Sequence, residues 1–413
     1  MKTLKFTLKI DAIESYIYSG HLFFILTNGQ IVYSPISRII TKLVNEYPYF
    51  ENLIRVSFQR NDYLNNRQAE VFFGIGEMKK SFIHLWERAS EEMEFTIDID
   101  ENDYNIIDEV PSMPVLDLKM YAMRLYVGSK EGLYEINLNS DDRYNLEPTK
   151  PQKRFDGKVT CLNAKSGEII ISSNSNGLFH GTFLNSSNNL KVNEKAVAKK
   201  SIRTGWSGYD VINYDKQNDF EYYVNETEKI ENKLNYSKFD EDSERRRITD
   251  FGSSKYGLST LLAHSRIEKE EINYCFNSST SGFFFMKDGS FVNINLNKPK
   301  DKQLYFVSKN KVLPTLKNGS ANFLKPLSTS IVPEGCVVEY FDKVVLYQNS
   351  KAKIIENTSA INVRTYTSSK RYRNLISVTK EKEITIHSIF PFKEDSFALT
   401  IEDFENNTVF EFL

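Results

Sequence analysis

A short hairpin pattern recurs along the chain, and this repetition constrains the fold more than any other feature of the sequence. Each copy has an apolar strand, a short turn of small or polar residues, and a second apolar strand. Asn-Gly and Asp-Gly pairs occur in several of these turns and supply the positive φ that a tight turn between strands needs. The clearest copies are His21–Tyr33, Arg124–Ile136, Glu168–Phe179 and Gly282–Ile294.

Weaker copies of the same hairpin fill the gaps at Tyr209–Val224, Val344–Ile355 and Leu375–Ile386. Some steps between turns are close to about 40–45 residues, the size of a four-stranded propeller blade. Further strand-like runs precede the hairpins, for example Pro114–Leu118. Very apolar runs such as Phe283–Phe285 suit strands that are covered on both faces. The sequence therefore predicts an all-β fold, a β-propeller of about seven blades.

Two segments carry a resemblance to known propellers. Arg124 to Leu138 resembles the blades of regulator-type and WD40-like propellers, and Glu168 to Phe183 is similar to it. The resemblance implies an architecture and no particular function. Lys5–Lys9 and Thr408–Phe412 both alternate like strands. We expect these terminal segments to pair within one blade, which would close the propeller between the chain termini and make residues 1–413 a single domain.

Residues 37–92 break the repeat and predict a helical insertion after the first hairpin. Apolar residues fall at helical spacing in 37–47 and again in 77–91. These helices either pack on each other and on the propeller or present a face to a partner. We predict a partner contact at Phe82, Leu85 and Trp86, because large aromatic side chains dominate binding hot spots.

The charge balance argues against a partner that is recognised by charge alone. The chain has 53 basic and 55 acidic residues, a formal net charge of −2, so it lacks the overall positive field that recruits nucleic acid. Two local basic clusters are interpreted first as solvated edges and more weakly as nucleic-acid contacts. They are Arg245, Arg246 and Arg247, and Lys370, Arg371 and Arg373.

No pattern in the sequence predicts a catalytic residue, a cofactor or a metal ligand set. Asp98 to Glu109 approaches a calcium-binding loop, but Asp103 stands where such a loop needs glycine. The cysteines Cys161, Cys275 and Cys336 lie far apart without metal-ligand spacing, which predicts buried, reduced thiols. The catalytic residues of propeller enzymes come from loops of separate blades. The spacing of residues along the sequence therefore does not exclude a catalytic site.

The leading functional hypothesis is a non-catalytic interaction scaffold, a subunit of a larger cytosolic assembly that binds one or more proteins. The N-terminal residues lack the apolar core of a signal peptide, and no run approaches the ~18 apolar residues of a membrane span. A cytoplasmic protein without a membrane partner is expected. One alternative is a ligand-binding or hydrolytic propeller with a site at the central channel. A second is an accessory subunit that contacts nucleic acid.

Overall fold

The computed structural model describes residues 3–59, 71, 74–110, 112–140, 146–183, 189–229, 246–251, 256–258, 262, 267–278, 281–288, 291–297, 305–310, 325–333, 335–348 and 351–389. These residues divide into two compact units. The first unit contains residues up to Glu109 and from Pro326 onward, and the second contains Val110 to Asp141 and Leu146 to Lys325. That all 413 residues form one domain stays a prediction.

The described residues contain seven blade sheets of consecutive antiparallel strands, so the predicted β-propeller with seven blades is confirmed. Each of the seven predicted hairpins lies in a different sheet. We number the blades in chain order, which places blades 1, 6 and 7 in the first unit and blades 2 to 5 in the second.

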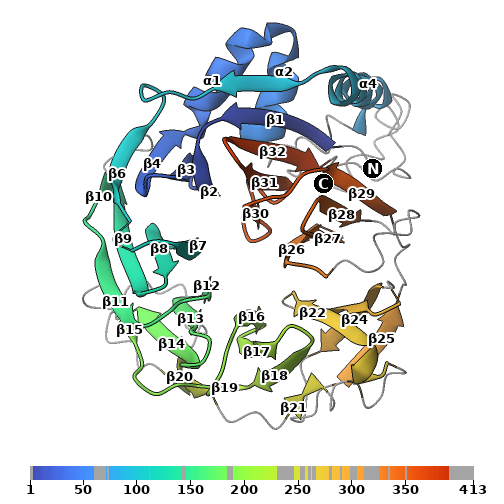
Figure 1. Cartoon of the computed structure of the whole chain (residues 1–413). Helices are drawn as coiled ribbons and strands as arrows, with labels where there is room; N and C mark the ends of the chain where they lie inside the picture. Colours follow the sequence, from blue (N-terminus) through green and yellow to red (C-terminus); the bar gives the residue numbers. More distant parts are fainter. Residues whose placement is uncertain are drawn as a thin grey trace, which may run out of the picture. The chain divides into compact units, whose positions relative to one another are not determined.

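Blades 1 and 6 each have four strands (Figure 1). Blade 1 consists of β2 (Ala12–Tyr18), β3 (His21–Leu26), β4 (Gln30–Pro35) and β6 (Asn105–Glu109). Blade 6 consists of β26 (Ser328–Val332), β27 (Gly335–Glu339), β28 (Val344–Gln348) and β29 (Lys351–Glu356).

The four blades of the second unit follow the same plan. Blade 2 consists of β7 (Val115–Tyr121), β8 (Arg124–Ser129), β9 (Gly132–Ser140) and β10 (Leu146–Pro148), with β11 (Gln152–Asp156) also on β9. Blade 3 consists of β12 (Cys161–Lys165), β13 (Glu168–Ser172), β14 (Leu178–Phe183) and β15 (Leu190–Val192). Blade 4 consists of β16 (Arg203–Ser207), β17 (Asp210–Lys216), β18 (Asp219–Tyr223) and β21 (Tyr256–Gly257). Blade 5 consists of β22 (Ile272–Asn277), β23 (Ser281–Met286), β24 (Phe291–Asn297) and β25 (Tyr305–Asn310), preceded by the 3-10 turn η4 (Lys269–Glu271).

Apolar side chains fill the space between neighbouring blades within each unit. Blade 5 illustrates this, because Phe283, Phe284 and Phe285 of β23 are all buried, as the apolar run predicts. Phe284 packs towards blade 4, 6.5 Å from the ring of Phe220, whereas Phe283 stacks 4.8 Å from Phe276 on the opposite face of the sheet. Such strands are covered on both faces, which explains why they are continuously apolar.

Blade 7 joins the two ends of the chain. It contains β30 (Asn362–Thr365), β31 (Leu375–Lys380) and β32 (Glu383–Ile389), followed by β1 (Thr3–Lys9) and β5 (Phe95–Asp98). The N-terminal strand β1 pairs antiparallel with β32, so the closure between chain termini is confirmed. The predicted C-terminal partner, Thr408–Phe412, lies outside the described residues.

The helical insertion leaves blade 1 after β4, adds a strand to blade 7 and returns to blade 1 as β6. Its helices lie next to β1 and β5 (Figure 1). They are α1 (Ile36–Glu46), the 3-10 turn η1 (Pro48–Phe50), α2 (Glu51–Ile54), the π-helical turn η2 (Arg55–Gln59) and α4 (Gly76–Glu92). The predicted helices 37–47 and 77–91 correspond closely to α1 and α4.

Alternating side chains of β1 explain why the insertion docks on this blade. Leu4, Phe6 and Leu8 are fully buried, and the ring of Phe6 meets that of Phe58 edge-on at 4.7 Å. Burying each such side chain contributes about 1.5–3 kcal/mol. Strand β5 runs parallel to β1, with Phe95 anchored against the ring of Tyr47 at 4.9 Å.

The hydroxyl of Tyr47 also caps the outer edge of β5. It accepts a hydrogen bond from the Thr96 amide at 3.2 Å and donates to the Glu94 carbonyl at 3.1 Å. In a parallel strand these groups point away from β1, so without Tyr47 they would form an open sheet edge.

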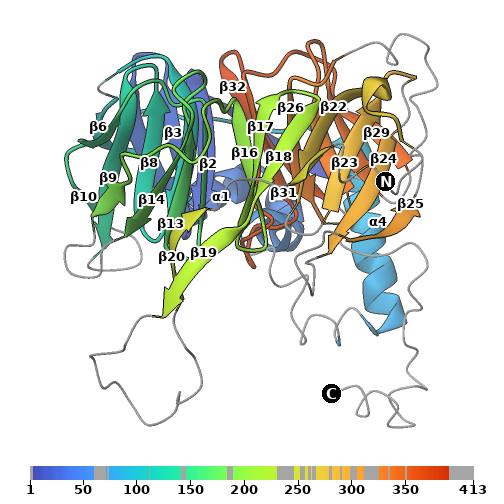
Figure 2. The same cartoon turned by 90° about the horizontal axis from the view of Figure 1, so that it is seen from below.

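A two-stranded ribbon extends from blade 4 (Figure 2). It consists of β19 (Asn225–Lys229) and β20 (Arg246–Phe251), which pair antiparallel. The buried Phe251 anchors its base, 5.1 Å from the ring of His180 in blade 3.

Candidate functional site

Helix α4 carries the three residues that the sequence predicts as a partner contact. The Trp86 side chain is completely buried, whereas Phe82 and Leu85 are partly exposed. The rings of Phe82 and Trp86 lie 5.9 Å apart. Trp86 therefore supports the helix from beneath, and any accessible apolar surface belongs to its neighbours.

The accessible apolar residues of α4 form one ridge. Met78, Phe82 and Leu85 are spaced by four and three residues, so they project from adjacent turns on one side of the helix. Met78 is 36% exposed. His84 is exposed about 100° round the helix from Leu85, and Arg88, one turn after His84, pairs with Glu92 at 2.9 Å. We call Met78, Phe82 and Leu85 the α4 ridge.

The two basic clusters belong to different units. Lys370, Arg371 and Arg373 are exposed in the segment between β30 and β31. Arg246 and Arg247 lie on β20, where their backbone registers with Lys229 and Glu228 of β19. Arg245 lies outside the described residues. Contact with nucleic acid at these positions stays a prediction.

Three exposed apolar residues on blades 6 and 7 are not predicted from the sequence. Phe341 is 76% exposed in the turn between β27 and β28, and that turn closes with a 2.8 Å hydrogen bond from the Tyr340 amide to the Lys343 carbonyl. Leu327, just before β26, and Ile361, just before β30, are about half exposed. One sequence signal is available, because Phe341 stands in a turn, where small or polar residues are usual.

The innermost strands of the first unit carry a buried ion pair. Arg364 of β30 donates to the Glu14 carboxylate of β2 through Nη2 at 2.7 Å and Nε at 3.3 Å, and Asn362 donates to Glu14 at 2.7 Å. Burial raises the pKa of the nearby Glu339, whose carboxylate accepts a hydrogen bond from Ser328. The contacts of Glu14 with Arg364 and Asn362 link blades 1 and 7, whereas the Ser328–Glu339 hydrogen bond lies within blade 6.

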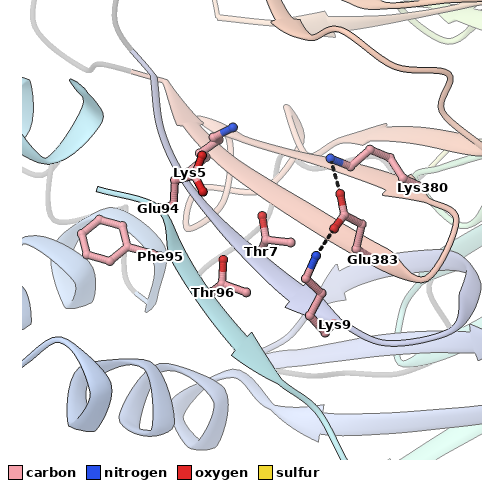
Figure 3. Close-up of a pocket in the computed structure, with 8 residues that line it drawn as sticks. All are labelled: Lys5, Thr7, Lys9, Glu94, Phe95, Thr96, Lys380 and Glu383. Carbon is pink, nitrogen blue, oxygen red and sulfur yellow. Dashed lines mark hydrogen bonds and ion pairs between the residues drawn. The ribbon is translucent and has the colours of Figure 1, made fainter. Parts of the chain in front are cut away.

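A small polar pocket of about 160 Å³ opens on blade 7 (Figure 3). Its charged lining contains three lysines and two glutamates, and two threonine hydroxyls lie between them. The lining residues are Lys5, Thr7 and Lys9 of β1, Glu94, Phe95 and Thr96 at β5, and Lys380 and Glu383 at the turn between β31 and β32.

A chain of ion pairs runs along one side of this pocket. Glu383 binds both Lys9 and Lys380, the latter at 2.7 Å. Lys380 also pairs at 2.7 Å with Glu356 of β29, which accepts a 2.9 Å hydrogen bond from Nε2 of the buried His387. These contacts hold blades 6 and 7 together.

The pKa values of this chain follow from burial and pairing. Burial lowers the pKa of His387, and the positive charges of Lys5 and Lys380 lower it further. Burial alone would raise the pKa of Glu356, but its contacts with His387 and Lys380 outweigh burial and lower the pKa to about 2. Glu356 and Lys380 are therefore both ionised at neutral pH.

The acidic segment after β5 resembles a calcium loop in sequence and is held by a lysine in the structure. Lys42 of α1 pairs with Asp103 at 2.6 Å and lies 3.8 Å from Asp100. The Asn102 amide donates to Asp100 at 2.8 Å, closing a tight turn. The Lys42 ammonium thus lies beside Asp100, one of the carboxylates at a ligand position of such a loop.

The cysteines are free thiols, and Cys275 and Cys336 are buried. Burial raises the pKa of Cys161 to about 11 and that of Cys275 to about 12, and it raises the pKa of Cys336 further still. Among the residues that the structure describes, no group of three or more His, Cys, Asp or Glu side chains is placed to hold a metal ion. In the same part of the chain, no helix is both long and apolar enough to span a bilayer.

No family model and no curated protein matches this chain. Similar solved structures include the β-propeller domain of Cps50 (Swd1) from Myceliophteria thermophila, with 8% identity, a TM-score of 0.46, and coverage of 94% of this chain and 100% of that chain. The WD40 domain of Pan2 from Neurospora crassa has 6% identity and a TM-score of 0.41 over 95% and 91% of the two chains. A chain of the mitotic checkpoint complex has 9% identity and a TM-score of 0.46 over 93% and 94%.

Likeness at such identities carries no information about partners or activity. The assignment of the fold depends instead on the strand order within each sheet and on the pairing of β1 with β32. By these features the chain is a β-propeller.

Proposed function

We propose that this chain is a non-catalytic protein-interaction subunit and that the α4 ridge contacts its partner. The proposal depends on which residues of α4 are buried. Trp86 and Ala89 are buried and fix the helix in place. Met78, Phe82 and Leu85 lie beside them and keep accessible apolar surface. A ridge on a firmly packed helix loses little conformational entropy on binding, which favours recognition by a partner groove.

The insertion itself supports an added role. The four strands of blade 1 and the β30, β31, β32 and β1 strands of blade 7 already form complete sheets without α4. Two alternatives remain as proposals of lower rank. They are a ligand-binding or hydrolytic site at the central channel and a nucleic-acid contact through the basic clusters.

Substitutions that leave the support beneath α4 intact provide the test. Leu85→Asp places a charge on the ridge and should abolish co-purification of the partner from a lysate of the source cells. His84→Asp introduces the same charge at an exposed position about 100° round the helix from Leu85 and serves as the matched control. Trp86→Ala is unsuitable here, because it would open a cavity in the core.

Phe341→Asp tests the competing surface on blade 6 in the same experiment. We expect it to retain the partner, as His84→Asp does. Loss of the partner with Phe341→Asp and its retention with Leu85→Asp would move the contact to blade 6. Retention by all three folded variants would reject both surfaces.

A further inference from the structure

The pocket on blade 7 is lined by ammonium and hydroxyl donors, and the ion pairs around the pocket do not engage all of them. Lys5, Thr7 and Lys9 alternate along β1 and so project from the same face of the strand, opposite the buried Leu4, Phe6 and Leu8. Across the parallel ladder, Thr7 registers with Thr96 of β5. Figure 3 shows the two threonine side chains next to each other, with their hydroxyls towards the same space.

Two of these donors lack a partner among the described residues. Lys9 and Lys380 share the single carboxylate of Glu383, but the Lys5 ammonium makes no ion pair with any described carboxylate. The Thr96 hydroxyl likewise makes no hydrogen bond within that part of the chain, whereas Thr7 shares its hydroxyl with Thr385 at 3.3 Å. The pocket lining thus has one more lysine than glutamate.

We propose that this pocket binds a phosphoryl group, with Lys5 and Lys9 as the cationic donors and Thr7 and Thr96 as the hydroxyl donors. A volume of about 160 Å³ corresponds to about five water molecules, which is room for a group of one phosphorus and four oxygens. Ammonium and hydroxyl groups are suited to this ligand, because hydrogen bonds to an ionised oxygen are stronger than those between neutral groups.

The geometry places the cations on both sides of the hydroxyls. Along a strand, residues four apart are separated by about 13 Å, so the Lys5 and Lys9 side chains can reach towards Thr7 from opposite directions. The field of Lys5 extends to its cross-strand neighbour His387, whose pKa it helps to lower. Glu94 lines the same pocket, and its negative charge repels an anion. Removal of this charge should therefore strengthen phosphate binding, whereas removal of the Lys5 charge should weaken it.

Binding of inorganic phosphate, followed by titration calorimetry at constant ionic strength, is the primary experiment. Lys5→Gln should weaken phosphate about two- to fivefold, and Glu94→Gln should strengthen it by a similar factor, as expected for partly exposed charges. Thr96→Val removes one hydroxyl without changing charge or strand propensity and should also weaken binding. Lys382→Gln, an exposed lysine in the neighbouring turn that does not line the pocket, is the control.

The source of the phosphoryl group is resolved by a second arm, using a short peptide with one phosphoserine and its unphosphorylated counterpart. Tighter binding of the phosphopeptide than of phosphate indicates a phosphorylated protein segment, whereas equal binding indicates recognition of the free group. The proposal is overturned if phosphate does not saturate or if Lys5→Gln and Lys382→Gln weaken binding equally. If phosphate saturates but both peptides bind alike, the ligand is the free group and not a phosphorylated segment. Leu85→Asp should leave phosphate binding unchanged, so this proposal and that for the α4 ridge fail independently.

Discussion

Tyr47 satisfies two backbone groups at the edge of β5 with a single hydroxyl and lies 3.5 Å from a third. It contacts the Thr96 amide and the carbonyls of Glu94 and Thr96. Tyr47→Phe keeps the ring against Phe95 but removes these hydrogen bonds, so we expect a loss of about 1 kcal/mol in the free energy of unfolding. Denaturant titration measures it. Tyr49→Phe is the matched control, because Tyr49 is 71% exposed and its hydroxyl makes no hydrogen bond with a described residue. Equal effects of the two substitutions would show that the Tyr47 hydroxyl does not hold the edge.

Glu356 should make the free energy of unfolding fall at acidic pH. Its pKa of about 2 in the folded state lies below the ordinary value of 4.5, so its stabilising contribution is complete above pH 4.5 and is lost as the pH falls towards 2. A shift of this size corresponds to about 3 kcal/mol. The lowered pKa of His387 acts in the same direction, because the unfolded chain takes up that proton more readily.

The check on Glu356 is a comparison of wild type with Glu356→Gln by denaturant titration from pH 6 downward. We expect the variant to be less stable at pH 6 and the difference to narrow below pH 4.5. A difference that stays constant with pH would mean that Glu356 titrates normally in the folded protein.

At the scale of single elements, the sequence predicts those structures that local chemistry determines. The Asn28–Gly29 turn is one case, since Gly29 has φ of +89° and only a residue without Cβ adopts this freely. Helix α1 is another, because its apolar residues repeat at helical spacing and are buried together. The free thiols and the doubly covered strand β23 follow from local sequence in the same way.

Elements whose role depends on distant partners are harder to predict. Phe95 to Asp98 has the pattern of a strand, but nothing in those residues specifies β1 as its partner or a parallel direction. Trp86 and Leu85 are adjacent in one amphipathic helix, and only the packing of α4 on β1 and α2 decides which of them is buried. The pocket was not predicted because it combines residues from β1, β5 and the turn before β32.

For the whole molecule, the N-terminal strand should matter far more than its length suggests. A chain that begins at Ile10 lacks β1 and therefore loses the burial of Leu4, Phe6 and Leu8 as well as the pairing with both β32 and β5. The lost burial alone amounts to about 5–9 kcal/mol, comparable with the total stability of many domains. We expect a large fall in melting temperature.

A synthetic peptide of residues 1–10 should restore the melting temperature of that shortened chain when added in trans. A peptide with Phe6→Asp is the control and should have no effect. A shortened chain that melts like the full-length protein would show that blade 7 is stable without β1.

The position of β5 also has a consequence for the order of events during synthesis. Strand β1 leaves the ribosome well before its antiparallel partner β32, which follows about 380 residues later. At ordinary rates of translation, roughly 15–60 s pass between the completion of β5 and that of β32. Throughout this interval, β5 can already occupy one edge of β1, and the insertion helices can cover its apolar face. The insertion thereby shields β1 during synthesis: it covers the apolar face and one edge of the strand until β32 is made and pairs with the other edge.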